Sequence, residues 1–186
     1  MLPSGTALLL VDIQQGFDDP AWGTRNNPEA EVQIVRLLGA WRQVGWPVLH
    51  VQHLSTEPDS PLRPDQPGSA LRPEVAPQPG EPLFQKHVNS AFIGTGLEAY
   101  LRERAITTLL VVGLTTNHCI STTVRMAGNL GFETYVAADA TATFARTGHD
   151  GQAFSADEVH AVALASLHGE FATVVAAEDV LDALPG

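Results

Sequence analysis

The chain has 186 residues, which suits one domain with its own hydrophobic core over residues 1–186. Its net charge of -11 disfavours nucleic acid as a partner, because phosphate binding needs clustered lysine and arginine. No apolar run approaches the roughly 20 residues of a membrane helix, and a single cysteine cannot form an internal disulfide. We therefore expect a cytoplasmic protein that binds neither nucleic acid nor membranes.

The first predicted strand covers residues 7–13 and is apolar except for Asp12 near its end. An acid there is costly unless it is paired or functional. A polar loop with one aromatic residue, Phe17, follows. A helix is predicted from Pro28 to about Val44, with its apolar residues on one face, and Gly45 ends it.

A second strand is predicted over residues 47–52, and the regular pattern then disappears from residue 53 to residue 82. Eight of the 13 prolines fall in this stretch, which we call the cover segment. Long irregular segments inside compact domains usually have a functional role or are disordered. Because strands flank it on both sides, we expect the cover segment to fold over the site.

A short strand over residues 83–86 ends at Lys86, the only lysine in a chain with nine arginines. That bias indicates a position where a guanidinium does not suffice. Two capping boxes are predicted downstream, one from Thr95 to Glu98 and one from Ser155 to Glu158. The second of these begins a helix that we expect to reach about His168.

Residues 108–131, which we call the nucleophile segment, combine a strand and a helix. Leu109 to Val112 form a doubly buried strand that we expect Gly113 to break, and a helix follows up to Gly131. Cys119, the only cysteine, lies in the first turn of this helix. The dipole of a helix N-terminus lowers a thiol pKa, so Cys119 is a candidate nucleophile. A small buried hydrophobic residue is the alternative interpretation.

Further strands are predicted over residues 134–138 and 173–176, so strands and helices alternate along the chain. This alternation indicates an α/β fold with a parallel sheet covered on both faces. The site of such a sheet lies beyond the carboxyl ends of its strands. Asp12, Lys86 and Cys119 each lie at such a strand end, and together they offer a base, a cation and a nucleophile.

At this point the sequence resembles the isochorismatase-like cysteine hydrolases. The order and spacing of the matching motifs are specific from about residue 6 to residue 180. The motifs are Asp12 with Gln14, Lys86 before Asn89-Ser-Ala-Phe92, Gly94-Thr95 with Leu97, Gly113-Leu-Thr-Thr-Asn-His-Cys119, and Asp139-Ala140.

The resemblance implies a three-layer α/β/α fold with a six-stranded parallel sheet in the Rossmann-like order 3-2-1-4-5-6. It also implies a catalytic triad of Asp12, Lys86 and Cys119, and a non-proline cis peptide between Leu114 and Thr115. The backbone N–H groups of Thr115 and Cys119 would form the oxyanion hole. A homo-oligomer, dimer or tetramer, is expected as well.

The implied reaction is hydrolysis of a small amide or lactam through a thioester, without a cofactor or a metal. A zinc nicotinamidase is disfavoured because the Asp-x-His of those relatives is missing from Gln52-His53-Leu54-Ser55. His50 and His53 also point to opposite faces of one strand. Residues that we expect to contact the substrate are Phe17, His53, Asn89, Phe92 and His118.

Three other functions stay open. A vinyl-ether hydrolase of the isochorismatase type needs basic groups for an anionic substrate, and the predicted site loops carry few. The stretch from residue 115 to residue 144 is similar to the streptothricin hydrolase branch, whose members open the lactam of a polycationic antibiotic. A catalytically silent binding protein would retain the fold without using the triad.

Overall fold

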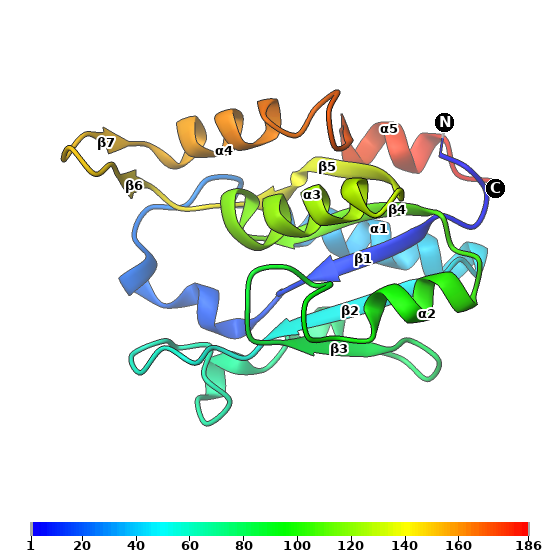
Figure 1. The fold of residues 1–186 in the computed structure, drawn as a ribbon, viewed down its shortest axis with the longest axis horizontal. Coiled ribbons are helices and arrows are strands. Elements are labelled where there is room, and N and C mark those ends of the chain that lie inside the picture. Colours follow the sequence, from blue (N-terminus) through cyan, green and yellow to red (C-terminus); the bar gives the residue numbers. More distant parts are fainter. Residues whose placement is uncertain (1, 186) are drawn as a thin grey trace.

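The computed structural model describes residues 2–185 and contains a six-stranded parallel sheet in the order β3-β2-β1-β4-β5-β8 (Figure 1). Numbered along the sheet strands alone, this is the predicted order 3-2-1-4-5-6. The six strands are β1 (Ala7–Val11), β2 (Val48–His53), β3 (Leu83–Lys86), β4 (Thr108–Leu114), β5 (Glu133–Ala142) and β8 (Thr173–Val175).

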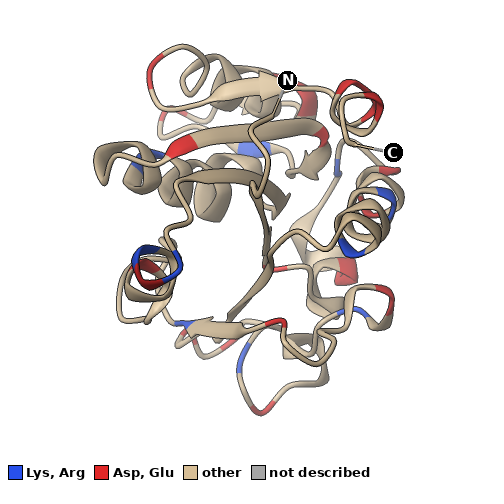
Figure 2. Cartoon of the chain, turned by 90° about the vertical axis from the view of Figure 1, so that its right-hand side faces the viewer, with Lys and Arg blue, Asp and Glu red and all other residues tan. Residues whose placement is uncertain are grey.

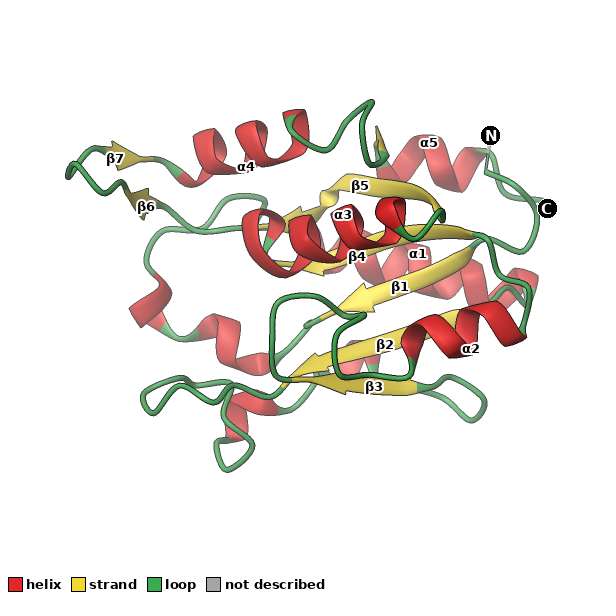
Figure 3. Cartoon of the chain, viewed as in Figure 1, coloured by secondary structure: helices red, strands yellow, loops and turns green. Residues whose placement is uncertain are grey.

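Helices cover both faces of the sheet and complete the predicted three-layer arrangement (Figure 3). The core residues of α2, α3 and α4 pack on one face, and those of α1 and α5 pack on the other. The helices are α1 (Ala30–Val44), α2 (Leu97–Glu103), α3 (Ser121–Asn129), α4 (Ala156–Ala165) and α5 (Ala177–Asp182).

The central strands β1 and β4 are buried along their whole length, as their continuous apolar runs predicted. Alternate residues of β1 enter different cores. Leu9 and Val11 pack toward α2 and α3, whereas Leu8 and Leu10 pack toward α1. The sheet therefore separates two hydrophobic cores, and both cores pack against β1, the strand that Asp12 follows.

The predicted helix ends are partly right. Gly45 ends α1 in the left-handed conformation, and Ser155 with Glu158 forms a complete capping box on α4. The capping box at Thr95 is wrong, because α2 begins only at Leu97 and the Glu98 side chain accepts hydrogen bonds from Arg102 instead. The helix α4 ends earlier than predicted, at Ala165.

Gly113 does not break its strand, contrary to the sequence prediction. It lies inside β4 with φ at 120°, and a Cβ atom there would stand 2.0 Å from the carbonyl oxygen of Val11. Glycine therefore lets β4 continue beside β1. A second difference is a small hairpin, β6 (Arg146–Thr147) with β7 (Ala153–Phe154), where only a polar loop was predicted.

After His53, the last residue of β2, the cover segment has only two short 3-10 turns, Pro67–Ser69 and Pro73–Val75. Its C-terminal part is tied to α1 by Glu81, which accepts hydrogen bonds from Arg42.

Acidic residues are spread over many elements and are not gathered on one face of the cartoon (Figure 2). Within residues 2–185, no helix is long and apolar enough to span a membrane.

Candidate active site

Three strand ends place the predicted triad in one buried cluster. Asp12 directly follows β1, Lys86 is the last residue of β3, and Cys119 lies in a π-helical turn, η5 (Thr116–Ile120), after β4. All three side chains are buried. The sheet order sets β3 two strands away from β1, so the long lysine side chain bridges the distance that shorter residues could not.

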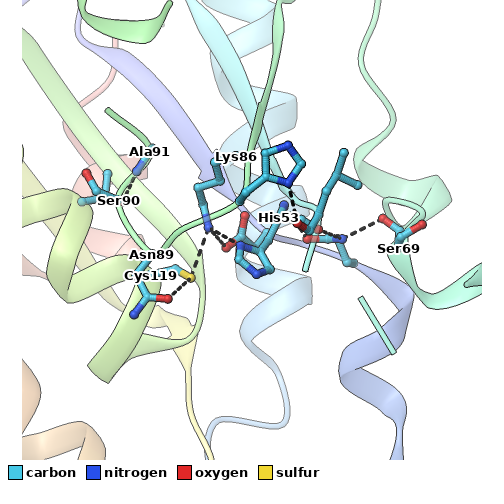
Figure 4. Close-up of polar contacts among 12 residues, drawn as sticks. His53, Ser69, Lys86, Asn89, Ser90, Ala91 and Cys119 are labelled. Carbon is cyan, nitrogen blue, oxygen red and sulfur yellow. Dashed lines mark hydrogen bonds and ion pairs between the residues drawn. The ribbon is translucent and has the colours of Figure 1, made fainter. Parts of the chain in front are cut away.

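The Lys86 ammonium is the centre of this cluster (Figure 4). Its Nζ donates to Asp12 Oδ2 at 2.6 Å and to Cys119 Sγ at 3.2 Å, and it also contacts His53 Nδ1 at 3.2 Å. One cation thus contacts the candidate base, the candidate nucleophile and an imidazole. A buried charge of this kind is tolerated because it is paired and hydrogen-bonded.

Protonation in the cluster differs from the sequence prediction. Burial and the neighbouring Asp12 carboxylate raise the pKa of the Cys119 thiol, and together they outweigh Lys86, which lowers it. The prediction that the helix N-terminus lowers this pKa is therefore wrong. Burial also raises the pKa of Asp12, with Lys86 opposing it. The resting thiol keeps its proton, and the raised pKa of Asp12 suits a general base.

The Asp12 carboxylate has one free oxygen. Oδ2 is taken by Lys86, whereas the buried Oδ1 has no hydrogen-bond partner within residues 2–185. The residue also adopts a left-handed conformation, with φ at 54°. Such a backbone conformation is uncommon for a non-glycine residue and clusters at functional sites. Oδ1 is therefore available to take a proton.

His53 is held neutral beside the lysine. Its burial, with Lys86 as the second cause, lowers its pKa to about 4. Gln14 fixes the backbone of His53, because its amide accepts from the His53 N–H at 2.9 Å and donates to the His53 carbonyl at 2.9 Å. The same Gln14 amide donates to Ser69 O at 2.7 Å. Gln14 therefore joins the site to the cover segment.

The residues of the cluster do not fit a catalytic metal. Ligand atoms of Asp12, His53 and Cys119 lie within 4.8 Å of one another, but each of these residues contacts the Lys86 ammonium, which stands where a cation would bind. His50, the other histidine of β2, faces away and contacts Glu81 at 2.9 Å. The donor set that a zinc nicotinamidase needs is therefore not assembled by these side chains.

The five residues expected to contact the substrate lie in different surroundings. His53 touches Lys86, and the Cys119 thiol points to Asn89 Oδ1 at 3.9 Å. Phe92 belongs to the hydrophobic cluster that contains Cys119. Phe17 packs on Trp22 in a separate cluster, and His118 is exposed, with no hydrogen bond from its ring to the triad within residues 2–185. The role of all five in substrate binding stays a prediction.

The peptide bond between Leu114 and Thr115 is cis, as the resemblance implied. The Thr115 carbonyl accepts from the N–H groups of His118 and Ile120, at 3.0 Å and 3.2 Å. Its N–H has no hydrogen-bond partner in the part of the chain that the structure describes. Thr115 directly precedes the turn that carries Cys119, and a free backbone donor at that place is what an oxyanion hole requires.

Sequence reasoning missed the cavity beside His53. It measures about 470 Å³, and Trp22 and the start of the cover segment line it. The Trp22 indole is fixed by a hydrogen bond from Nε1 to Gly16 O at 2.9 Å and packs on Phe17 at 5.3 Å between ring centroids. The sequence analysis names only Phe17 in this region, because no local pattern shows which aromatic residue faces the cavity.

Comparison with known proteins agrees with this geometry. The model of the isochorismatase domain family matches residues 6–179. The isochorismatase family protein YrdC of Bacillus subtilis is 46% identical over 95% of this chain and 94% of its own length. The crystal structure of an isochorismatase-family protein from Chromobacterium violaceum superposes with a TM-score of 0.94 and 50% identity, over 98% of this chain and 95% of the other.

Two relatives with named activities are more distant. The ureidoacrylate amidohydrolase RutB of Agrobacterium fabrum is 30% identical over 75% of this chain and 76% of its own length. The streptothricin hydrolase of Streptomyces noursei is 35% identical over 74% of this chain and 50% of its own length. With the family model covering almost the whole chain and the fold and strand order matching, the chain belongs to the isochorismatase family of hydrolases.

Proposed function

We propose that the chain hydrolyses a carbon–nitrogen bond of a small amide or lactam through a thioester on Cys119. The observation that carries the proposal is the Lys86 ammonium, which contacts both the Asp12 carboxylate and the Cys119 sulfur inside a buried cluster. Asp12 is the base, Cys119 is the nucleophile, and Lys86 stabilises the negative charge that passes from the Asp12 carboxylate to the sulfur when the proton is transferred.

In the first half of the reaction, Asp12 takes the thiol proton as the sulfur attacks the carbonyl carbon. The raised thiol pKa means that this proton moves only when the sulfur begins to form its bond. The carbonyl oxygen becomes an oxyanion, for which the unpaired Thr115 N–H is a donor. When the tetrahedral intermediate collapses, the carbon–nitrogen bond breaks and Asp12 returns its proton to the leaving nitrogen.

In the second half, water attacks the thioester while Asp12 accepts one of its protons. The carbon–sulfur bond breaks, the carboxylic acid leaves, and the proton on Asp12 returns to the Cys119 sulfur. Atoms balance with one water consumed in each turnover. An amide suits this cycle because its nitrogen needs the proton that Asp12 has just received.

The bond class is also supported by the relatives. RutB is named for amide hydrolysis, and the streptothricin hydrolase is named for an antibiotic that the acidic charge of this chain would suit. A streptothricin-type lactam is accordingly the first substrate to test. Nicotinamide-type amides and vinyl ethers are the alternatives, and the poor fit of the cluster to a metal disfavours a zinc-dependent nicotinamidase.

The test is a mass-spectrometric assay on a mixed panel of lactams, amides and vinyl ethers. Wild type and Cys119→Ala are incubated with the panel in the presence of a metal chelator. We expect one or more amides or lactams to gain one water with wild type and none with the variant. Conversion of vinyl ethers alone, or equal conversion by both proteins, would contradict the proposal.

A catalytically silent protein is separated from an enzyme by the thiol itself. A trapped thioester, seen as an added acyl mass on Cys119 after rapid quenching, is expected only if the sulfur attacks the substrate. An inert thiol together with an unconverted panel would favour the binding protein.

A further inference from the structure

The cavity beside His53 differs in charge from other hollows of the molecule. In the described part of the chain, four other hollows of about 290 to 460 Å³ each have at least one arginine in their wall. The cavity beside His53, of about 470 Å³, has neither lysine nor arginine among its lining residues. Its acidic lining residues are Glu57 and Asp59, both exposed at the start of the cover segment. The wall of this cavity therefore favours a cation over an anion.

No cation of the chain neutralises these two carboxylates. Within residues 2–185, neither Glu57 nor Asp59 forms an ion pair. Arg63 donates to the carbonyl of Pro58, which lies between them in the sequence, at 2.8 Å, but its guanidinium is already paired with Asp65 at 2.9 Å. Because the pair of Arg63 and Asp65 has no net charge, the wall keeps the two negative charges of Glu57 and Asp59.

The cavity also has an aromatic wall. Trp22 lines it, and the indole is held in place by the bond from Nε1 to Gly16 O at 2.9 Å. The ring packs against Phe17 and Phe144, with ring centroids 5.3 Å and 5.6 Å away. Phe17 and Phe144 are buried, so Trp22 is the member of this aromatic cluster that lines the cavity. An indole fixed in this way attracts a cation through its quadrupole, and tryptophan does so better than any other side chain.

His53 joins the cavity to the catalytic cluster. It lines the cavity, and its Nδ1 contacts Lys86 Nζ at 3.2 Å (Figure 4). The charge of Lys86 is balanced by Asp12 Oδ2 at 2.6 Å, and the imidazole of His53 is neutral. The catalytic lysine therefore adds no uncompensated positive charge on the side of the cavity.

We propose that the cavity is a subsite for a cationic group of the substrate, an alkylammonium, with Trp22 as its aromatic wall and Glu57 and Asp59 as its counter-charges. The inference rests on the proposed function and narrows the substrate to an amide or lactam that carries a positive charge. A volume of about 470 Å³ is typical of small-molecule sites. The carbonyl lies at Cys119, and the cationic end extends past His53 toward Trp22. Anionic substrates would meet the two carboxylates instead.

The first experiment measures binding without turnover, using Cys119→Ala and two pairs of amides. One pair carries a trimethylammonium group, or the neutral tert-butyl group of the same shape, on the amine side of the amide. The other pair carries the same two groups on the acyl side. Isothermal titration calorimetry gives the dissociation constants. We expect the cationic member of at least one pair to bind about tenfold more tightly than the neutral member. Equal affinities in both pairs, tighter binding of the neutral members, or no measurable binding would overturn the proposal.

Variants of the aromatic wall assign this preference to the cavity. In the Cys119→Ala background, Trp22→Leu should remove most of the preference for the cation, and Trp22→Phe should keep an intermediate preference because a ring remains. Circular dichroism checks that both variants fold. A preference that is unchanged in Trp22→Leu would show that the cation binds elsewhere.

Variants of the carboxylates should have a smaller effect. Glu57→Gln and Asp59→Asn should each reduce the preference about twofold to threefold, because water and salt screen exposed carboxylates. Asp179→Asn removes one negative charge at an exposed position on α5, outside the cavity, and is the matched control. We expect it to leave the preference unchanged. An equal reduction in all three variants would mean that the net charge of the chain, and not the cavity wall, selects the cation.

The second experiment separates this inference from the proposed function. Wild type is incubated with the same amides, and the released acid and amine are measured. We expect kcat/KM for the cationic member of the better-binding pair to exceed that of its neutral partner by about tenfold. Selective binding of the cation without hydrolysis of any amide or lactam would contradict the thioester proposal and support the subsite. Faster hydrolysis of the neutral amides would support the hydrolase and overturn the subsite.

Discussion

The nucleophile segment and the cover segment both reach the active site, but they are held in different ways. In residues 108–131, β4 pairs with β1 and β5 along its length, and two hydrophobic cores pack against it. In residues 53–82, a few side-chain bonds and close backbone contacts replace regular structure. We therefore expect the first segment to open only with global unfolding and the second to open locally.

Matched glycine substitutions should give the largest contrast. A Cβ at Gly113 would stand 2.0 Å from Val11 O at the centre of the sheet, so Gly113→Ala should cost about 5 kcal/mol or more of unfolding free energy. A Cβ at Gly68 would stand 2.6 Å from Pro61 O, which belongs to the cover segment, and 2.7 Å from the Gly16 Cα, which belongs to the loop after β1. Gly68→Ala should therefore loosen that segment and leave the sheet intact.

Denaturant unfolding and limited proteolysis measure the two effects. We expect Gly113→Ala either to yield little soluble protein or to shift the whole unfolding transition to lower denaturant. We expect Gly68→Ala to leave most of the unfolding transition unchanged and to make the chain more susceptible to protease cleavage between residues 53 and 82. Equal global destabilisation by both changes would show that the two segments unfold together.

Lys86→Met should have the next largest effect, and it tests the point where the two segments meet. The change leaves the buried Asp12 carboxylate without its cation, which should cost about 3–5 kcal/mol of unfolding free energy at neutral pH. Turnover should fall below detection, because no charge then stabilises the thiolate. Urea unfolding and the panel assay measure the two losses.

The control for this prediction removes both charges. Lys86→Met combined with Asp12→Asn should recover part of the lost stability, since no unpaired buried charge remains, but it should recover no activity. If the double variant is as unstable as the sum of the single variants, the ion pair is not the source of the loss.

Gln14→Ala should have a smaller effect, confined to the junction between β1, His53 and the cover segment. It removes hydrogen bonds to both backbone groups of His53 and to Ser69 O. We expect a loss of about 1–3 kcal/mol and faster hydrogen exchange in the cover segment. Gln43→Ala, at an exposed position on α1, is the control. A similar loss in both variants would mean that the Gln14 bonds contribute little.

The same contrast explains what could be predicted from the sequence. Long apolar runs and glycine caps are local signals, so the strands, Gly45 and the Ser155 capping box were found. Asp12, Lys86 and Cys119 were found because each lies at the end of a strand, and parallel strands end at one edge of the sheet. The family resemblance supplied the cis peptide and the strand order.

The errors arise where distant atoms decide the outcome. The raised thiol pKa depends on burial and on Asp12, which lies more than a hundred positions away in the sequence. The close approach of Gly113 to Val11 is likewise a contact between two strands. The bonds of Gln14 and the cavity beside Trp22 are made by the cover segment, which has no periodicity to read.

The smallest predicted effect concerns pH and His53. The folded protein holds the pKa of His53 at about 4, below the imidazole value of about 6.5 in unfolded chains. Between these two pH values, the unfolded chain therefore binds a proton at His53 that the folded protein does not bind. The stability contributed by neutral His53 is complete above about pH 6.5 and is lost as the pH falls toward about 4.

His53→Gln should accordingly reduce the fall in unfolding free energy over that pH range. His149→Gln, at an exposed position in the hairpin turn, is the matched control and should keep the wild-type slope. The slope in both variants is measured by urea unfolding at several pH values. An unchanged slope in His53→Gln would mean that the imidazole is not held neutral beside Lys86. The Lys86 ammonium would then be held by Asp12 and Cys119 alone, and His53 would not act as a neutral hydrogen-bond acceptor for it.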